Sequence, residues 1–255
     1  MRENYKMIVN KRLLAKDLAL VICFTALYVI LSFLPFSPVI GFFSKAIVAA
    51  TILAPIIGII IGPKLGAFST FLGGTIAISI SPYFTPLGLV AGVITAIFAG
   101  MLTRGKYIAS VFLYFSLLSL FGFYPFVGPV WLYPPLMWFQ ITGFIILISP
   151  LQTIALKTLN STDSAKLLFG FFITSLTSTL AGQIAGSLTS EILAGPIFMA
   201  DVNSWKTIWQ ITTFLYPVER TVIALGATFI GASLYKVLKS ANLSFPINQK
   251  PFESV

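Results

Sequence analysis

Long apolar runs fill almost the whole of this 255-residue chain, and its few charged residues fall between them. Hydrophobic residues make up 57% of the sequence and charged residues only 9%. A soluble domain carries about 25% charged residues. A soluble protein of this size could not cover its surface with so few charges. The composition therefore predicts a protein that is surrounded mostly by lipid.

A helix needs about 20 mostly apolar residues to cross the hydrocarbon core of a bilayer. Eight runs are candidate spans: 17–36, 43–62, 65–81, 86–103, 107–125, 132–156, 167–194 and 206–235. They are too long and too continuous for the alternating strands of a transmembrane barrel. The predicted fold class is all-α, a polytopic transmembrane helical bundle of six to eight spans. Because no soluble domain interrupts the runs, residues 1–255 are expected to form a single integral domain of the cell membrane.

The basic residues predict the orientation of this bundle. With eight spans and the N-terminus inside, 13 of the 16 basic residues fall on the inner side, as the positive-inside rule requires. Both termini are therefore predicted to be cytoplasmic, with a basic N-terminal segment at 1–16 and a tail at 240–255. This distribution accounts for the net charge of +9 without nucleic acid as a partner.

Several kinds of chemistry are excluded by the residues that the chain lacks. Cys23 is its only cysteine and it has no histidine, so a disulfide within the chain, a cysteine metal cluster and a Ser-His-Asp triad are impossible. The sequence has no Walker-type phosphate loop, so any use of ATP must come from a partner. We expect no enzymatic activity, no catalytic residues, no metal and no cofactor.

Polar residues recur at steps of four in the run 167–194: Ser175, Thr179, Gln183 and Ser187, followed by Ser190 and Glu191. This spacing places them along one slowly drifting face of a helix. Serine and threonine can bond to their own helix backbone, so the amide of Gln183 and the carboxyl group of Glu191 are the more informative members. The face either joins helices by hydrogen bonds or lines a path or pocket for a solute.

The run 206–235 carries two adjacent charges. Glu219 and Arg220 lie about 20 Å along a helix that begins near Lys206, which is close to the middle of the bilayer. A charge at that depth costs roughly 3 kcal/mol, so each side chain is expected to face a cavity or a partner. Because adjacent helical residues point about 100° apart, the two need not pair with each other. The alternative is a structural ion pair between two helices. Pro217 is expected to free a backbone carbonyl for the cavity.

These two runs together predict a ligand-binding site in the outer half of the bilayer. Gln183 and Thr213 are expected to lie at matching depths on antiparallel neighbours, and Arg220 at the floor could attract an anionic group. The candidate ligand-binding residues are Gln183, Ser187, Glu191, Trp209, Thr213, Tyr216, Glu219 and Arg220.

Two further patterns have simpler interpretations. Glycine and alanine recur every four residues in several runs, which favours close packing of helices. Aromatic residues gather between Phe121 and Phe139. They either anchor the protein at the headgroup level or line the mouth of a site for a flat ligand.

Parts of the chain resemble the S component, the substrate-binding membrane subunit of energy-coupling factor vitamin transporters. The resemblance covers about half of the chain. It rests on TALYVILSFLP (25–35), ATILAPIIGIIIGPKLGAFSTFLGG (50–74), TPLGLVAGVITAIFAGMLTRGKY (85–107) and ERTVIALGATFIG (219–231). Members of this family have six helices. The resemblance therefore implies that two of the eight runs are re-entrant or broken, or that this is an enlarged member.

The resemblance implies high-affinity capture of a vitamin or related micronutrient from outside. Uptake would be energised by two cytoplasmic ATPases through a transmembrane coupling subunit. In the family an Ala-x-x-x-Ala patch on the first helix meets the coupling subunit. The matching residues here are Ala19 and Cys23, with Ala26 one turn further on, so cysteine replaces the second alanine. The alternatives are a stand-alone ion-coupled secondary transporter, with Glu219 as the carrier, and an integral membrane enzyme or scaffold.

Overall fold

The computed structural model describes residues 2–41, 44–198 and 201–241, and the side chains of 15–41, 44–194 and 201–241. The described chain is 82% helical, which confirms the all-α fold class. Its α-helices are α1 (Arg2–Leu31), α2 (Ala50–Ile61), α3 (Pro63–Ile80), α4 (Pro86–Thr103), α5 (Tyr107–Gly122), α6 (Pro129–Leu132), α7 (Trp138–Ile148), α8 (Pro150–Thr158), α9 (Ser164–Phe198) and α10 (Val202–Ser240). A 3₁₀ turn, η1 (Pro134–Met137), precedes α7, and strands β1 (Pro35–Pro38) and β2 (Ala46–Val48) form a hairpin between α1 and α2. Most of the predicted tail, from 242 onward, and Met1 lie outside the described residues.

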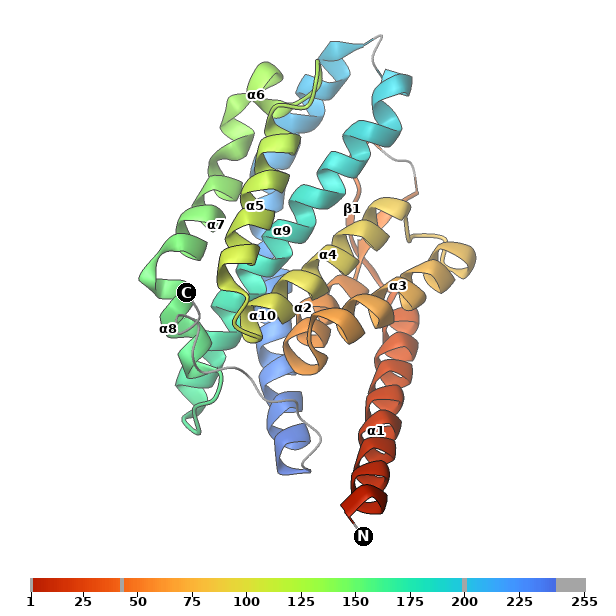
Figure 1. The fold of residues 1–255 in the computed structure, drawn as a ribbon. Helices are drawn as coiled ribbons and strands as arrows, with labels where there is room; N and C mark the ends of the chain where they lie inside the picture. Colours follow the sequence, from red (N-terminus) through yellow and green to blue (C-terminus); the bar gives the residue numbers. More distant parts are fainter. Residues whose placement is uncertain (1, 42–43, 199–200, 242–255) are drawn as a thin grey trace.

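The two longest helices, α9 and α10, run antiparallel through the molecule (Figure 1). Helices α5, α7 and α8 pack along one side of α9, while α2 and α4 pack along another. Helix α2 is almost wholly enclosed, since ten of its twelve residues are buried. Helix α1 packs mainly against α3, and its first turns extend away from the other helices. The start of α1 and the end of α10 lie toward the same end of the molecule.

Close contacts between helices depend on the glycines of the predicted packing stripes. A Cβ atom at Gly58 in α2 would lie 2.3 Å from the carbonyl oxygen of Ala96 in α4. A Cβ atom at Gly182 in α9 would lie 1.9 Å from Thr95 Oγ1 and 2.5 Å from the carbonyl oxygen of Ala91. The distances to the two carbonyl oxygens are too short for any side chain without movement of a backbone. The packing interpretation of these small residues is confirmed.

Two predicted spans have different boundaries in the structure. In the run 17–36 the helix ends at Leu31. In the run 43–62, residues 46–48 form a strand instead of a helix. Proline has no backbone N–H and a fixed φ, so Pro35 and Pro38 cannot continue α1. Branched residues such as Ile47 and Val48 favour an extended strand. The twelve residues left in α2 are too few to cross a bilayer alone.

The predicted run 132–156 is broken at Ser149. Its two parts, Pro134–Ile148 and α8, meet at an angle of 66°. Pro150 disfavours a helical conformation for Ser149, which instead caps α8 by accepting a hydrogen bond from the N–H of Leu151. Within the described residues, α4, Ser164–Ala194 of α9, and α10 are long and apolar enough to cross a membrane, and the bent pair makes a fourth if it is one span.

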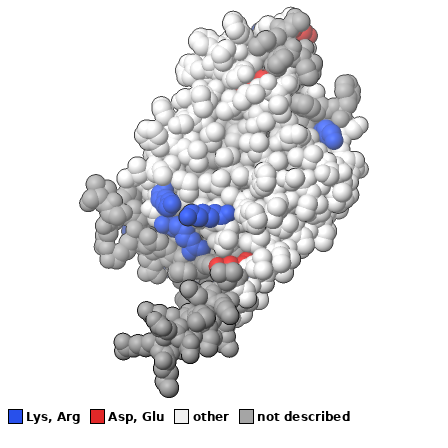
Figure 2. Space-filling model, turned by 45° about the vertical axis from the view of Figure 1, so that its right-hand side comes forward, with Lys and Arg blue, Asp and Glu red and all other residues white. Residues whose placement is uncertain are grey.

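The outer surface of the bundle is compatible with contact with lipid. Large apolar side chains project from it on several helices, including Phe112 on α5 and Phe214 and Val218 on α10, each more than 60% exposed. Figure 2 shows several Lys and Arg side chains in a cluster on the lower left part of this face and one apart from it near the right-hand edge, with a broad uncharged surface between them. The described surface therefore fits a membrane protein.

Candidate ligand-binding pocket

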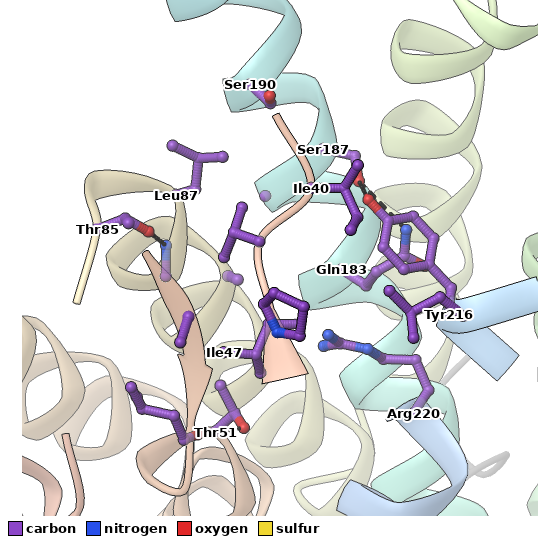
Figure 3. Close-up of a pocket in the computed structure, with 18 of the residues that line it drawn as sticks. Ile40, Ile47, Thr51, Thr85, Leu87, Gln183, Ser187, Ser190, Tyr216 and Arg220 are labelled. Atoms are coloured by element: carbon purple, nitrogen blue, oxygen red, sulfur yellow. Dashed lines mark hydrogen bonds between the residues drawn. The ribbon is translucent and has the colours of Figure 1, made fainter. Parts of the chain in front are cut away.

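A pocket lies where α9 and α10 meet the β-hairpin, the start of α2 and the start of α4. The space free of protein atoms measures about 820 Å³, including the open mouth. Apolar side chains such as Ile47, Ile208 and Leu215 form most of its wall. In Figure 3, Gln183, Ser187, Tyr216 and Arg220 lie on one side of this space. A cleft of this kind, apolar with a few convergent polar groups, is typical of a site for a small molecule.

The β-hairpin closes one side of the pocket and is held in place at several points. Both strands contribute to the wall, through Pro38 and Ala46–Val48. The backbone N–H of Ala46 donates to the carbonyl oxygen of Tyr83 at 3.2 Å, and Lys45 Nζ donates to that of Pro82 at 3.0 Å. These bonds join the hairpin to the connection between α3 and α4. The hairpin is therefore a fixed part of the pocket wall in this conformation.

The start of α4 supplies the wall next to α9. Thr85 caps this helix by accepting a hydrogen bond from the N–H of Gly88 at 3.0 Å, and Pro86 occupies its first turn. This is a common helix-start signal, and it places Leu87, Gly88 and Ala91 against the pocket. A Cβ atom at Gly186 in α9 would lie 3.2 Å from the Cβ atom of Ala91, so the two helices meet closely at the edge of the pocket.

A chain of polar side chains crosses from α7 through α9 to α10. Gln140 Nε2 donates to Gln183 Oε1 at 3.2 Å, and Gln183 Nε2 donates to Ser187 Oγ at 3.2 Å. Ser187 Oγ in turn lies 3.4 Å from the hydroxyl oxygen of Tyr216. These contacts join three helices, as the first interpretation of this face predicted. Because Gln183, Ser187 and Tyr216 also line the pocket, the same groups remain next to space that a solute could fill.

Glu219 and Arg220 contact each other, contrary to the expectation that each would meet a different partner. Arg220 Nη2 lies 3.6 Å from Glu219 Oε2, and the hydroxyl group of Ser37 in β1 donates a short hydrogen bond to Glu219 Oε1. Flexible side chains bring together two groups whose Cβ atoms point apart. Arg220 lines the pocket, as predicted, whereas Glu219 lies behind it.

Pro217 leaves a carbonyl group without its usual helical hydrogen bond, but this carbonyl group does not line the pocket. Helix α10 continues through Pro217, and the missing N–H would have bonded to the carbonyl oxygen of Thr213. Trp138 Nε1 donates to that oxygen instead, at 3.4 Å. The hydroxyl group of Thr213 donates to the carbonyl oxygen of Trp209 at 2.7 Å. Thr213 is thus engaged in packing and does not line the pocket.

The register of the two long helices differs from the predicted one. Ser187 meets Tyr216, so one turn further along each antiparallel helix Gln183 lies at the level of Arg220 rather than Thr213. The predicted match counted about two turns inward from Glu191 and from Lys206. Helix α9 continues seven residues past Glu191, to Phe198, whereas α10 begins only four residues before Lys206, at Val202. The two starting points are therefore not at the same level.

Trp209 and Glu191 differ in how they relate to the pocket. Trp209 is buried, borders the pocket and donates its indole N–H to the carbonyl oxygen of Val127 at 2.8 Å. Glu191 is fully buried outside the pocket wall, and neither of its carboxyl oxygens has a hydrogen-bond partner among the described residues. It is four residues, or about one turn, beyond Ser187 on α9.

Five of the eight candidate ligand-binding residues therefore line the pocket: Gln183, Ser187, Trp209, Tyr216 and Arg220. Sequence reasoning missed the contributions of the hairpin and of residues 84–91. The prolines at 35 and 38 and the Thr85-Pro86 pair were the available signals. No residue of the aromatic segment 121–139 lines this pocket. Phe126 and Trp131 in this segment are largely exposed, which favours the anchor interpretation.

The three residues predicted to dock a partner lie on one exposed side of α1. Ala19, Cys23 and Ala26 are all exposed, so they do not pack inside the bundle. Within the described residues, no group of three or more His, Cys, Asp or Glu side chains could hold a metal ion. Comparisons of this chain with protein-family models, with curated proteins and with solved structures gave no match.

Proposed function

We propose that this chain is the high-affinity binding subunit of a membrane uptake system for a vitamin or related small micronutrient. The observation that carries the proposal is the pocket between α9, α10 and the β-hairpin in an apolar helical bundle. Its apolar wall suits a small organic molecule, and its polar groups converge from one side. The sequence has no Walker-type phosphate loop, so uptake driven by ATP requires a partner that hydrolyses it.

The proposed energy source follows from the resemblance to S components. Two cytoplasmic ATPases would act through a transmembrane coupling subunit that contacts the exposed stripe Ala19, Cys23 and Ala26. Small side chains allow another helix to approach closely in lipid. Replacing Ala19 and Cys23 with leucine should abolish uptake and leave ligand binding intact. Equal loss of binding would show that the stripe supports the fold of this chain instead.

The proposed topology has six to eight spans and both termini in the cytoplasm. The start of α1 and the end of α10 lie toward the same end of the molecule, which supports an even number of crossings (Figure 1). Single cysteines at Asn4 and Ser240, introduced into a Cys23→Ser background, should resist a membrane-impermeant thiol reagent in intact cells. Labelling of either site before cell lysis would contradict this orientation.

The function is tested by identifying what the protein carries. Small molecules and proteins that co-purify with the full chain should be identified by mass spectrometry. Uptake of the identified molecule should then be measured with and without the partner ATPases. Uptake that stops when the ATPases are inactivated is the expected result. A chain that binds no small molecule in any preparation, or uptake that continues without ATPases, would contradict the proposal.

A second candidate function is a stand-alone ion-coupled transporter, and Glu191 favours it. A fully buried carboxyl group without a described hydrogen-bond partner is a natural site for a transported proton or cation in a membrane protein. In this case Glu191→Gln would abolish concentrative uptake in proteoliposomes and leave equilibrium binding unchanged. Uptake driven by an imposed ion gradient in the absence of any partner would decide for this function.

A further inference from the structure

Among the described residues that line the pocket, Arg220 is the one with a charged side chain. Its side chain is only 8% exposed, and its guanidinium group extends from α10 toward the pocket interior in Figure 3. A buried arginine normally has most of its five N–H donors satisfied, because burying an unpaired charge is costly. The surroundings of these donors therefore indicate what the pocket is built to hold.

The donors of Arg220 are left largely unused by the protein. Arg220 makes no hydrogen bond to any described residue, and its Nε atom is buried without a partner. The ionic contact with Glu219 has an N–O distance of 3.6 Å, whereas a charge-assisted hydrogen bond measures about 2.7–2.9 Å. Glu219 therefore lowers the cost of burying the positive charge without occupying the N–H groups.

Ser37 explains why Glu219 does not approach more closely. Its hydroxyl group donates to Glu219 Oε1 from the β-hairpin, which holds the carboxylate against β1, and neither Ser37 nor Glu219 lines the pocket. The hairpin is in turn bonded to the connection between α3 and α4. The guanidinium group is thus kept positioned and available on its pocket side.

We propose that the ligand of this pocket is a small monocarboxylic acid with an apolar body, whose carboxylate binds the free donors of Arg220. The inference rests on the proposed uptake function, because it uses the same pocket. A carboxylate matches the planar guanidinium fork and can accept two parallel hydrogen bonds from it. Glu219 already offsets part of the positive charge of Arg220, so a singly charged carboxylate adds less uncompensated negative charge to this apolar site than a doubly charged phosphate would.

The rest of the wall fits the other parts of such an acid. Ile47, Ile208 and Leu215 provide apolar contact for the body of the molecule. Tyr216 lies about one turn before Arg220 on α10, and Ser187 contacts Tyr216 from α9. These two hydroxyl groups can bond to a neutral polar group at the other end of the ligand. The acid could be a soluble metabolite or a fatty acid from the bilayer, since both present a carboxylate on an apolar body.

The experiment uses matched probes on the full-length purified protein. 3-Phenylpropionate and its neutral amide, 3-phenylpropionamide, have the same shape and differ in charge, and decanoate represents a fatty acid. Affinities are obtained from the shift in thermal unfolding midpoint with probe concentration. The wild type should bind the acid more tightly than the amide. Tighter binding of decanoate than of 3-phenylpropionate assigns the site to a fatty acid, and the reverse order assigns it to a soluble acid.

The variants separate a direct contact from a structural role. Arg220→Gln should weaken acid binding about 10- to 150-fold and leave amide binding unchanged, because only the charged hydrogen bonds are lost. Glu219→Gln should instead tighten acid binding, since the competing negative charge is removed. Lys206→Gln removes a basic charge from an exposed position of the same helix outside this pocket and should change neither. If Arg220→Gln fails to fold, the double variant Glu219→Gln/Arg220→Gln is measured in its place, because it leaves no unpaired charge at this position.

Two results would overturn the inference. One is equal binding of the acid and the amide by the wild type, or binding of none of the three probes. The other is a preference for the acid that persists in Arg220→Gln or in the double variant. If a neutral molecule co-purifies with the protein and is taken up, this inference fails while the proposed uptake function stands.

Discussion

The two halves of α9 carry similar polar residues but use them differently. In the first half, Thr177, Ser178 and Thr179 each donate to the backbone carbonyl oxygen four residues earlier in the same helix. In the second half, Gln183 and Ser187 form hydrogen bonds to side chains, including those of α7 and α10, and line the pocket. Residues of both groups are buried. Burial and polarity alone therefore do not distinguish packing from a binding surface.

The neighbouring elements explain this difference. The first half of α9 packs directly on α8, where a Cβ atom at Gly170 would lie 2.7 Å from the carbonyl oxygen of Ala155 and Thr177 Oγ1 donates to Gln152 Oε1 at 3.0 Å. The second half faces the hairpin and the polar part of α10, which leave open space between them. A polar face that repeats every four residues shows which side of a helix avoids lipid. It does not show whether that side packs against another helix or borders a pocket.

The largest expected effect concerns Gly182, which lies at the boundary between the two halves. Gly182→Ala places a Cβ atom against the backbone of α4 and should destabilise the protein by about 3 kcal/mol, near the upper end of typical overpacking costs. Both halves should be affected together, as a loss of thermal stability and of bound small molecule. In the matched control Gly88→Ala, the nearest atoms lie at 3.5 Å, so stability should be unchanged. Normal stability of Gly182→Ala would mean that α4 and α9 are further apart.

The next prediction tests the difference between the halves directly. Gln183→Ala should weaken retention of the co-purifying small molecule by about 5- to 150-fold, because a buried hydrogen-bonding group is removed from the pocket wall. Thr179 lies one turn earlier on α9, outside the pocket wall, and valine has nearly the same shape as threonine. Thr179→Val should therefore leave retention of the small molecule unchanged. Both can be measured by mass spectrometry of ligand extracted from equal amounts of folded protein. Equal losses in the two variants would remove the distinction between the halves.

The smallest expected effect concerns the contact between α9 and α10. Ser187→Ala and Tyr216→Phe should each lower the free energy of unfolding slightly. The loss in the double variant should be smaller than the sum of the two single losses, by less than about 1 kcal/mol. The shortfall is expected because either change removes the same 3.4 Å contact. Thr189 donates to its own helix, at the carbonyl oxygen of Ala185, so Thr189→Val with Tyr216→Phe should be additive. Additivity in the Ser187 pair as well would show that the contact contributes nothing.

The sequence alone was sufficient where local chemistry decides the structure. The predicted helix 86–103 agrees with α4, because Thr85 and Pro86 form a local start signal that needs no other part of the chain. The small residues at steps of four identified helix packing for the same kind of reason. Five of the eight candidate residues line one pocket because the polar groups of an apolar helix have few places to go other than the interior.

The tertiary structure decided how those elements meet. The carboxylate beside Arg220 is held by Ser37, which lies 182 residues before Glu219 in the chain. The register of α9 on α10 depends on where the turn between them falls, beyond the ends of the apolar runs. The carbonyl group freed by Pro217 is taken by Trp138 from a different helix. The sequence determined which groups must avoid lipid, but their partners depend on contacts between distant segments, which no local pattern records.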